Sequence, residues 1–300
     1  MDLCLAIDIG GTKMAVGLVA RDGTLFGARQ APTPDSADGE DLFAVLAGLV
    51  TAVLDGPSVP GPDDAAAAVV CGVGCGGPMD LVSGTVSPLN IPAWRAFPLR
   101  RHLEQLTGLE VVLDNDAKAF ALAEGSRGAA GRRRHFLAMV VSTGVGGGLV
   151  VDGRLLDGAS GNAGHVGHVI VEPDGRRCGC GARGCLEAEA SGTAIAAVTG
   201  RPASEAGADV VARTGRLVGR AVASVVSLLD IDLAVVGGSV ALGFGAPFFD
   251  AANDELTARA QLSFASAARI VPSGLGTAGP LVGAGALGWR ARAGDQARAS

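Results

Sequence analysis

Carboxylates cluster in the run Asp114-Asn115-Asp116, where an apolar strand pattern gives way to a helix pattern. A single Asp or Asn would suffice to cap that helix. The additional polar groups stand at the carboxyl end of a strand, where α/β sheets bind ligands. A carboxylate in this place can orient and deprotonate an attacking hydroxyl. The run therefore favours an enzyme that acts on an alcohol, with helix capping as the alternative.

Two glycine-rich turns suit phosphate groups. The first, Gly10–Lys13, follows Asp8 at the end of a predicted strand, and the second, Thr143–Gly148, repeats the pattern. Glycine leaves the amides of a turn uncovered, so they can point at anionic oxygens, and a carboxylate beside them suits Mg²⁺. An ordinary Gly-Gly hairpin is the alternative for either turn alone. Gly237-Gly238 forms a third, weaker glycine turn that would let an adenosine approach the backbone.

His168, Cys178, Cys180 and Cys185 offer one imidazole and three thiols in a short stretch. Four such ligands match a closed tetrahedral zinc site, which has no position for a reacting water. We therefore expect a structural Zn²⁺ that holds the loop 161–187 as one wall of the acceptor site. A redox pair is the alternative, but the spacing is Cys-x-Cys rather than Cys-x-x-Cys. The other three cysteines lie in or beside apolar runs and are expected in the core.

Composition excludes several classes of protein. Hydrophobic residues make up 48% of the chain and charged residues 18%, which is typical of a globular protein. The net charge of −6 argues against nucleic acid as the main partner. No apolar stretch reaches the ~18 residues of a membrane span, and the N-terminal residues lack the basic region of a signal peptide. Clustered cysteines indicate metal in a reducing compartment, so we predict a cytoplasmic protein with no membrane partner.

The two phosphate-type turns lie in two copies of one pattern: strand, glycine turn, strand, Asp-Gly turn, strand. The copies begin at Leu3 and Phe136, and such a duplication predicts two similar domains facing each other across a cleft. Further strands are expected at about 67–73, 110–113, 232–236 and 268–271, and helices at about 39–55, 97–107, 116–126, 188–198, 208–229, 246–262 and 278–292. This alternation predicts an α/β fold, and Pro57–Pro62 is expected to be a surface loop.

These motifs resemble those of the ROK family of sugar kinases and repressors, most closely its bacterial glucokinase-like members. Further matching segments are Gly76-Gly77-Pro78, Gly164–His168 and Leu186-Glu187, and the resemblance runs from about residue 3 to 290. It implies the actin-like, ribonuclease-H-like two-domain ATPase fold with a cleft between the domains. The expected domains are a small one, 1–115 plus about 281–300, and a large one, 116–280, which carries the zinc loop.

The resemblance also implies ATP-dependent phosphorylation of the 6-hydroxyl of a hexose or hexose derivative, with Mg²⁺ accompanying the ATP. Asp116 is the implied catalytic base. The implied sugar-binding residues are Gly77, Asn115, Asp116, His165, His168 and Glu187. The implied ATP-binding residues are Asp8, Gly10, Gly11, Thr12, Lys13, Thr143, Gly144, Gly146, Gly237 and Gly238. The expected partners are thus the sugar, ATP and further copies of the chain in a homodimer or homotetramer.

One residue departs from the family's usual pattern, because His165 stands where most members have a sugar-binding glutamate. A neutral imidazole offers one donor and one acceptor, whereas a carboxylate offers acceptors and a charge. The bound sugar is therefore expected to differ from glucose at carbon 2 or 3, with a neutral acyl or hydroxyl group favoured over an ammonium. A tolerated variant without effect on the sugar is the alternative.

Several acceptors and one other class of protein stay open. Glucose is the default acceptor, with N-acetylmannosamine, N-acetylglucosamine and the amino sugar kanosamine as alternatives, and polyphosphate is an alternative to ATP as donor. A sugar-sensing regulator is disfavoured because the first glycine motif begins near residue 8, which leaves no room before it for a DNA-binding domain. Intact Asp8, Thr12 and Asp116 argue against a sensor that has lost its activity.

Overall fold

The computed structural model describes residues 1–56 and 67–299, and the loop expected at Pro57–Pro62 lies outside them. The chain forms two compact units. Unit 1 comprises residues 1–123, 157–162 and 277–300, and unit 2 comprises residues 124–156 and 163–276. The first boundary therefore falls within helix α3 (Asp116–Arg127), whereas the sequence predicts it at 115/116. The start of α3 joins unit 1 because Gly283 approaches its backbone closely: a Cβ on Gly283 would lie 2.6 Å from Ala119.

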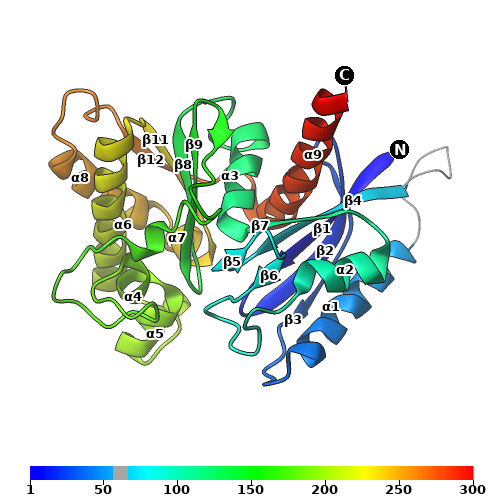
Figure 1. Ribbon diagram of the computed structural model, residues 1–300. Coiled ribbons are helices and arrows are strands. Elements are labelled where there is room, and N and C mark those ends of the chain that lie inside the picture. Colours follow the sequence, from blue (N-terminus) through cyan, green and yellow to red (C-terminus); the bar gives the residue numbers. More distant parts are fainter. Residues whose placement is uncertain (57–66, 300) are drawn as a thin grey trace. The chain divides into compact units, whose positions relative to one another are not determined.

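A five-stranded sheet in the order β3-β2-β1-β4-β7 forms the centre of unit 1 (Figure 1). The first three strands are antiparallel, and β4 and β7 run parallel to β1. The strands are β1 Asp2–Ile9, β2 Lys13–Ala20, β3 Leu25–Pro32, β4 Ala67–Cys75 and β7 Val111–Asn115, with a small pair β5 Met79–Asp80 and β6 Thr85–Val86. The other helices of the unit are α1 Gly39–Leu54, α2 Leu99–Thr107 and α9 Gly279–Ala299.

The two faces of this sheet carry side chains of different size. Large side chains of β1 such as Leu5 enter the core with α1 and α2. Ala6 lies on the opposite face and packs with α9. Helix α9 comes very close there, since a Cβ on Gly72 of β4 would lie 1.9 Å from the carbonyl oxygen of Ala284. Because side chains alternate along a strand, Asp8 emerges on this face of small residues.

Unit 2 repeats the arrangement with a sheet in the order β10-β9-β8-β11-β12. Again three antiparallel strands are followed by two strands parallel to the first, which matches the duplication predicted from the sequence. The strands are β8 Phe136–Val141, β9 Val145–Val151, β10 Arg154–Leu155, β11 Leu233–Gly237 and β12 Arg269–Pro272. The helices are α4 Leu186–Ala190, α5 Gly192–Thr199, α6 Ala208–Leu229, α7 Ser239–Phe244 and α8 Ala246–Arg259, with short 3₁₀ turns η1 Val166–His168 and η2 Ala203–Glu205. A third 3₁₀ turn, η3 Gly276–Ala278, spans the boundary at 276/277 between the two units.

Some predicted segments differ from the structure. The helix expected at 188–198 is two helices, because Ser191 ends α4 and its hydroxyl caps α5 by accepting from the Ala194 amide at 3.1 Å. Helix α7 was not predicted, α8 ends at Arg259, and α9 continues to Ala299. The second glycine turn is also shorter than predicted, since residues 146–148 belong to strand β9.

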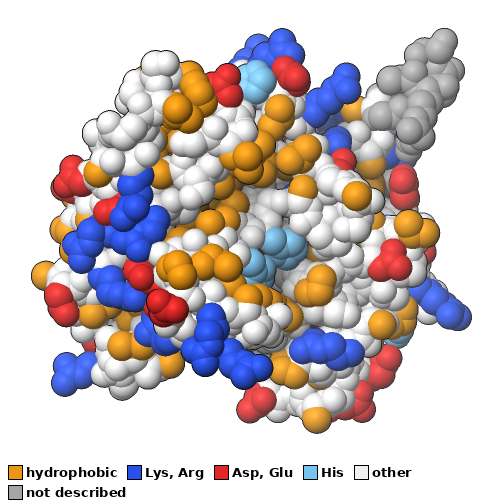
Figure 2. Space-filling model, turned by 60° about the vertical axis from the view of Figure 1, so that its left-hand side comes forward, with side chains coloured by type: hydrophobic (Ala, Val, Ile, Leu, Met, Phe, Trp, Pro, Cys, Tyr) orange, Lys and Arg blue, Asp and Glu red, His pale blue; other side chains and the backbone are white. Residues whose placement is uncertain are grey.

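The surface agrees with a protein of mixed charge. On the face drawn in Figure 2, basic and acidic side chains lie near one another over much of the area. Among residues 1–56 and 67–299, no helix combines the length and apolar character needed to cross a membrane.

Candidate active site and metal cluster

The predicted site residues divide between the two units. Those in unit 1 are Asp8, Gly10, Gly11, Thr12, Lys13, Gly77, Asn115 and Asp116. Those in unit 2 are Thr143, Gly144, Gly146, His165, His168, Cys178, Cys180, Cys185, Glu187, Gly237 and Gly238.

Asp8 and Asp116 interact in unit 1, where β1 ends and α3 begins. Gly74 lies beside Asp8 on β4, and a Cβ on Gly74 would be 3.3 Å from the Asp116 Cα. Burial and the negative charge of Asp116 raise the pKa of the Asp8 carboxyl to about 7, although Lys13 opposes the shift. Neighbouring carboxyls resist double ionisation unless a cation joins them. The pair therefore suits both a divalent cation and a proton acceptor.

The run of polar residues at the start of α3 does cap the helix. The side-chain oxygens of Asn115 and Asp116 both accept hydrogen bonds from the Ala117 amide, at 3.0 and 2.8 Å. The capping alternative is thus part of their role. Because two side chains share one N–H, capping does not account for both of them.

Lys118 is an important residue that the sequence pattern did not indicate. Its side chain is fully buried, and Nζ lies 2.9 Å from Asp114 Oδ1 and 3.0 Å from Asp157 Oδ1. It also donates to the carbonyl of Gly161 at 3.1 Å. Burial raises the pKa of the Asp114 carboxyl, and Lys118 opposes the rise. A buried ammonium needs such partners, and its four-residue spacing from Asp114 was the one available signal. The network fixes the first turn of α3, which begins at Asp116.

The first glycine turn is supported by neighbouring segments of unit 1. Thr33 donates its hydroxyl to the Gly10 carbonyl at 2.7 Å and its amide to the Thr12 carbonyl at 3.1 Å. Gly11 lies against Asn90, where a Cβ on the glycine would approach the Asn90 Cβ to 2.7 Å. A larger residue than glycine would therefore displace the turn.

The second glycine turn, in unit 2, consists of Ser142, Thr143 and Gly144, and Gly146 lies outside it in β9. Thr193 donates its hydroxyl to the Thr143 carbonyl at 2.9 Å. This contact was also not predicted, because a threonine near a helix start has no distinctive pattern. The turn is thus held by the N-terminal end of α5.

The third glycine turn follows β11 directly. Gly237 pairs with Val140 of β8, and Gly238 has a positive φ of 97°. A Cβ on Gly238 would lie 2.3 Å from the carbonyl oxygen of Val141. Glycine is therefore required here for close packing against the end of β8, next to the second turn.

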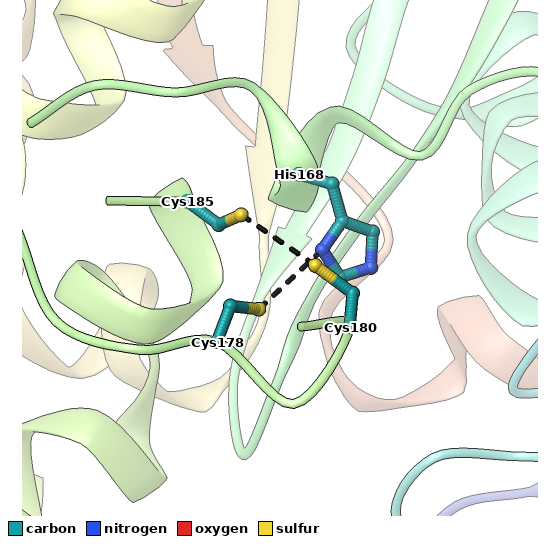
Figure 3. A group of neighbouring side chains, drawn as sticks. All are labelled: His168, Cys178, Cys180 and Cys185. Carbon is teal, nitrogen blue, oxygen red and sulfur yellow. Dashed lines mark hydrogen bonds between the residues drawn. The ribbon is translucent and has the colours of Figure 1, made fainter. Parts of the chain in front are cut away.

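The four predicted metal ligands converge in unit 2 (Figure 3). Their ligand atoms all lie within 4.8 Å of one another. His168 Nδ1 is 3.7 Å from Cys178 Sγ, and Cys180 Sγ is 3.7 Å from Cys185 Sγ. Bonds of about 2.3 Å in a tetrahedron place ligands about 3.7 Å apart, so the cluster fits Zn²⁺. Burial raises the pKa of the Cys185 thiol to about 12, so metal binding must displace its proton.

Glycines place His168 in this cluster. A Cβ on Gly147 of β9 would come within 2.7 Å of a side chain of η1, and one on Gly167 would lie 2.1 Å from the Val145 carbonyl oxygen. The 3₁₀ turn η1 therefore rests directly on β9. His165 precedes this turn, and its ring lies 5.9 Å from that of His168 between centroids.

Glu187 stands in the first turn of α4, close in sequence to the metal ligand Cys185. Its Oε2 accepts a hydrogen bond from the Val145 amide at 2.9 Å. The carboxylate predicted to hold a sugar hydroxyl therefore also binds the backbone where β9 begins.

Comparison with known proteins identifies the family of the chain. The model of the ROK family matches residues 4–291. The chain belongs to the ROK family. An N-acetylmannosamine kinase of Escherichia fergusonii is 40% identical over 258 residues, which cover 80% of this chain and 84% of that protein.

Two solved structures of the ROK family are also similar. A glucokinase from Streptomyces griseus, in complex with glucose and AMPPNP, is 30% identical with a TM-score of 0.83 and covers 96% of this chain and 99% of its own. A hexokinase from Thermus thermophilus is 32% identical with a TM-score of 0.77 and covers 97% and 99%. The predicted family, the actin-like two-domain α/β fold and the sugar-kinase class of enzyme are confirmed. For the acceptor, the curated relative favours the N-acetylhexosamine alternative over the glucokinase-like default.

Proposed function

We propose that this ROK family member transfers the γ-phosphoryl group of ATP to the 6-hydroxyl of N-acetylmannosamine. The observation that carries the choice of sugar is the 40% identity to an N-acetylmannosamine kinase. His165 argues against an amino sugar as acceptor, since a neutral imidazole suits a neutral acyl substituent better than an ammonium group. ATP as the donor is supported by the similar glucokinase, which was solved with AMPPNP.

Unit 1 supplies the proton acceptor and part of the phosphate site. Asp116 takes the proton of the sugar hydroxyl as its oxygen attacks the γ-phosphorus, and ADP leaves. Asp8 holds Mg²⁺ directly or through water, and a cation there favours the ionised form of a carboxyl whose pKa is otherwise about 7. The turn Gly10–Lys13 binds phosphate oxygens, and Asn115 and Gly77 bind the sugar.

Unit 2 supplies the remaining nucleotide and sugar contacts. Thr143 and Gly144 bind phosphate through backbone amides, and Gly237-Gly238 lets the nucleoside approach the chain. His165, His168 and Glu187 bind the sugar at its hydroxyl and acetamido groups. This assignment of His168 leaves Nε2 for the sugar, because Nδ1 lies beside the Cys178 sulfur.

We propose that His168 and the three cysteines hold a structural Zn²⁺. The donor set and the 3.7 Å separations support this. A bound Zn²⁺ would fix the ring of His168 and stabilise the loop locally. With four protein ligands it would take no part in the transfer step itself.

A glucose-type hexose is the second candidate acceptor, because the Streptomyces griseus glucokinase was solved with glucose and has a TM-score of 0.83. The two candidates separate in a panel of glucose, mannose, N-acetylglucosamine and N-acetylmannosamine with ATP and Mg²⁺. ADP release gives kcat/KM for each sugar, and the Asp116→Asn variant measures any contaminating kinase. The highest value is expected for N-acetylmannosamine. A higher kcat/KM for glucose would transfer the assignment to the second candidate.

A further inference from the structure

The turn at Ser142–Gly144 is held by backbone and side chains of unit 2 on two sides. On one side the amide of Gly192 donates to the Ser142 carbonyl at 2.7 Å. Thr193 donates both its hydroxyl, at 2.9 Å, and its amide, at 3.3 Å, to the Thr143 carbonyl. On the other side the Ser142 hydroxyl lies 2.9 Å from that of Ser239, the first residue of α7.

These contacts determine where the amides of the turn point. In a trans peptide the C=O and the N–H of the next residue point in opposite directions. Because α5 binds the carbonyls of Ser142 and Thr143, the amides of Thr143 and Gly144 are directed away from α5. Two successive amides pointing the same way form a site for an anionic oxygen. Contacts from α5 therefore orient the phosphate-binding groups.

The same helices lead back to the metal cluster. Cys185 is the N-cap residue of α4, and the adjoining Leu186 is fully buried and donates its amide to the Val169 carbonyl at 2.9 Å. Glu187 then binds the Val145 amide immediately after the turn. Ser191 is both the C-cap of α4 and the N-cap of α5, so two short helices separated by one residue connect Cys185 with Thr193.

We propose that Thr193 is a positioning residue for the turn at Ser142–Gly144, and that the metal cluster governs nucleotide affinity through α4, α5 and this threonine. The proposal rests on the proposed function, in which this turn binds phosphate of ATP. If the metal cluster supported only the sugar site, disturbing it would leave nucleotide binding unchanged in the absence of sugar. The proposal instead predicts that disturbing the cluster weakens nucleotide binding even when no sugar is present.

The test is titration calorimetry with AMPPNP-Mg²⁺ and, separately, with N-acetylmannosamine. Thr193→Val removes the hydroxyl and keeps the shape of the side chain. Thr199→Val is the matched control, since Thr199 ends the same helix and donates to the Ile195 carbonyl instead. We expect Thr193→Val to weaken AMPPNP binding about fivefold, as for one lost hydrogen bond. Sugar affinity and zinc content should stay within about twofold, Thr199→Val should match the wild type, and Thr193→Ser should restore nucleotide affinity.

The metal is tested in the same titration. Stripping Zn²⁺ from the wild type should weaken AMPPNP binding, and the loss should be smaller in Thr193→Val, where the connection is already broken. If Thr193→Val does not fold, Ser239→Ala should show the same selective loss from the other side of the turn. In the Thr193→Val variant, unchanged AMPPNP affinity or equal losses of nucleotide and sugar affinity would overturn the proposal. So would a Thr193→Ser variant that binds AMPPNP as weakly as Thr193→Val, or an AMPPNP affinity of the wild type that does not change when Zn²⁺ is stripped. A wild type that binds neither ligand would instead refute the proposed function.

Discussion

The two glycine turns occupy equivalent places in the two sheets but differ in charge. One residue before the end of the strand that precedes each turn, β1 carries Asp8 and β8 carries Val140. The first turn thus lies beside a pair of interacting carboxyls, and the second beside an apolar strand end. The two sheets share their strand order, but of the two strands β1 and β8 only β1 carries a carboxyl next to its last residue. Turns at equivalent places in the two sheets therefore have similar backbones but different side-chain chemistry.

The turns differ in support as well. Thr33 and Asn90 contact the first turn from within unit 1. The second is bound by α5 and α7 and adjoins Glu187, close to the metal cluster. We infer that unit 1 carries the proton transfer and that unit 2 carries the metal-supported binding groups.

Asp116→Asn should have the largest effect on activity, because it removes the proposed base beside the first glycine turn. We expect kcat to fall by about 10²–10⁴-fold. The fold should persist, since Asn can still accept from the Ala117 amide. Steady-state rates and the melting temperature measure both effects, with the Asp250→Asn variant, at an exposed position of α8, as control. Near-normal turnover in purified Asp116→Asn would refute the assignment.

Cys185→Ser should remove the metal that supports the binding groups of unit 2. A hydroxyl is a poor substitute for a thiolate at zinc, so we expect the bound Zn²⁺ to fall well below one per chain and sugar affinity to drop at least about tenfold. Elemental analysis of protein purified without chelator measures the metal. Cys4→Ala is the control, because this buried thiol lies outside the cluster. A wild type that contains no zinc would contradict the metal assignment.

Asp8→Asn tests whether the carboxyl beside the first glycine turn makes the stability of the protein depend on pH. The pKa of Asp8 is about 7 in the folded protein and about 3.9 in an unfolded chain. The unfolded state therefore loses its proton first, and the folded protein loses stability as the pH rises from about 4 to about 7. Without Mg²⁺, Asp8→Asn should be the more stable protein at pH 8, by on the order of 4 kcal/mol, with little difference at pH 4. Denaturant unfolding at both pH values measures this, and a pH-independent difference would contradict it.

His165→Glu should have the smallest effect and concerns only the choice of sugar. Changing one hydrogen-bonding group at a sugar position is expected to lower the kcat/KM ratio of N-acetylmannosamine over glucose about tenfold. His165→Gln is the matched control, because it supplies a donor and an acceptor without charge. If all sugars respond to His165→Glu by the same factor, His165 does not set the preference.

The sequence predicted the parts of this site that depend on residue type and local spacing. The cysteine cluster and Asp114–Asp116 are of this kind, because their chemistry requires those residues close together in the chain. Gly146 was assigned to a turn wrongly, because it lies in strand β9. A sequence does not distinguish glycines of a phosphate-type turn from neighbouring strand glycines such as Gly147, which lets η1 rest on β9. Thr193 was missed because its partner Thr143 is distant along the chain. Lys118 was missed although Asp114 lies four residues before it, because its burial and its second partner, Asp157, are known only from the folded chain.

The central claim is tested most directly by competition between two acceptors. Equimolar glucose and N-acetylmannosamine are offered to the wild-type protein with limiting ATP and Mg²⁺, and the phosphorylated products are quantified by NMR. Because the ratio of products reports the ratio of kcat/KM values, no separate rate is needed. The account predicts that N-acetylmannosamine 6-phosphate predominates by at least about tenfold. A predominance of glucose 6-phosphate, or a phosphate on another hydroxyl, would contradict it.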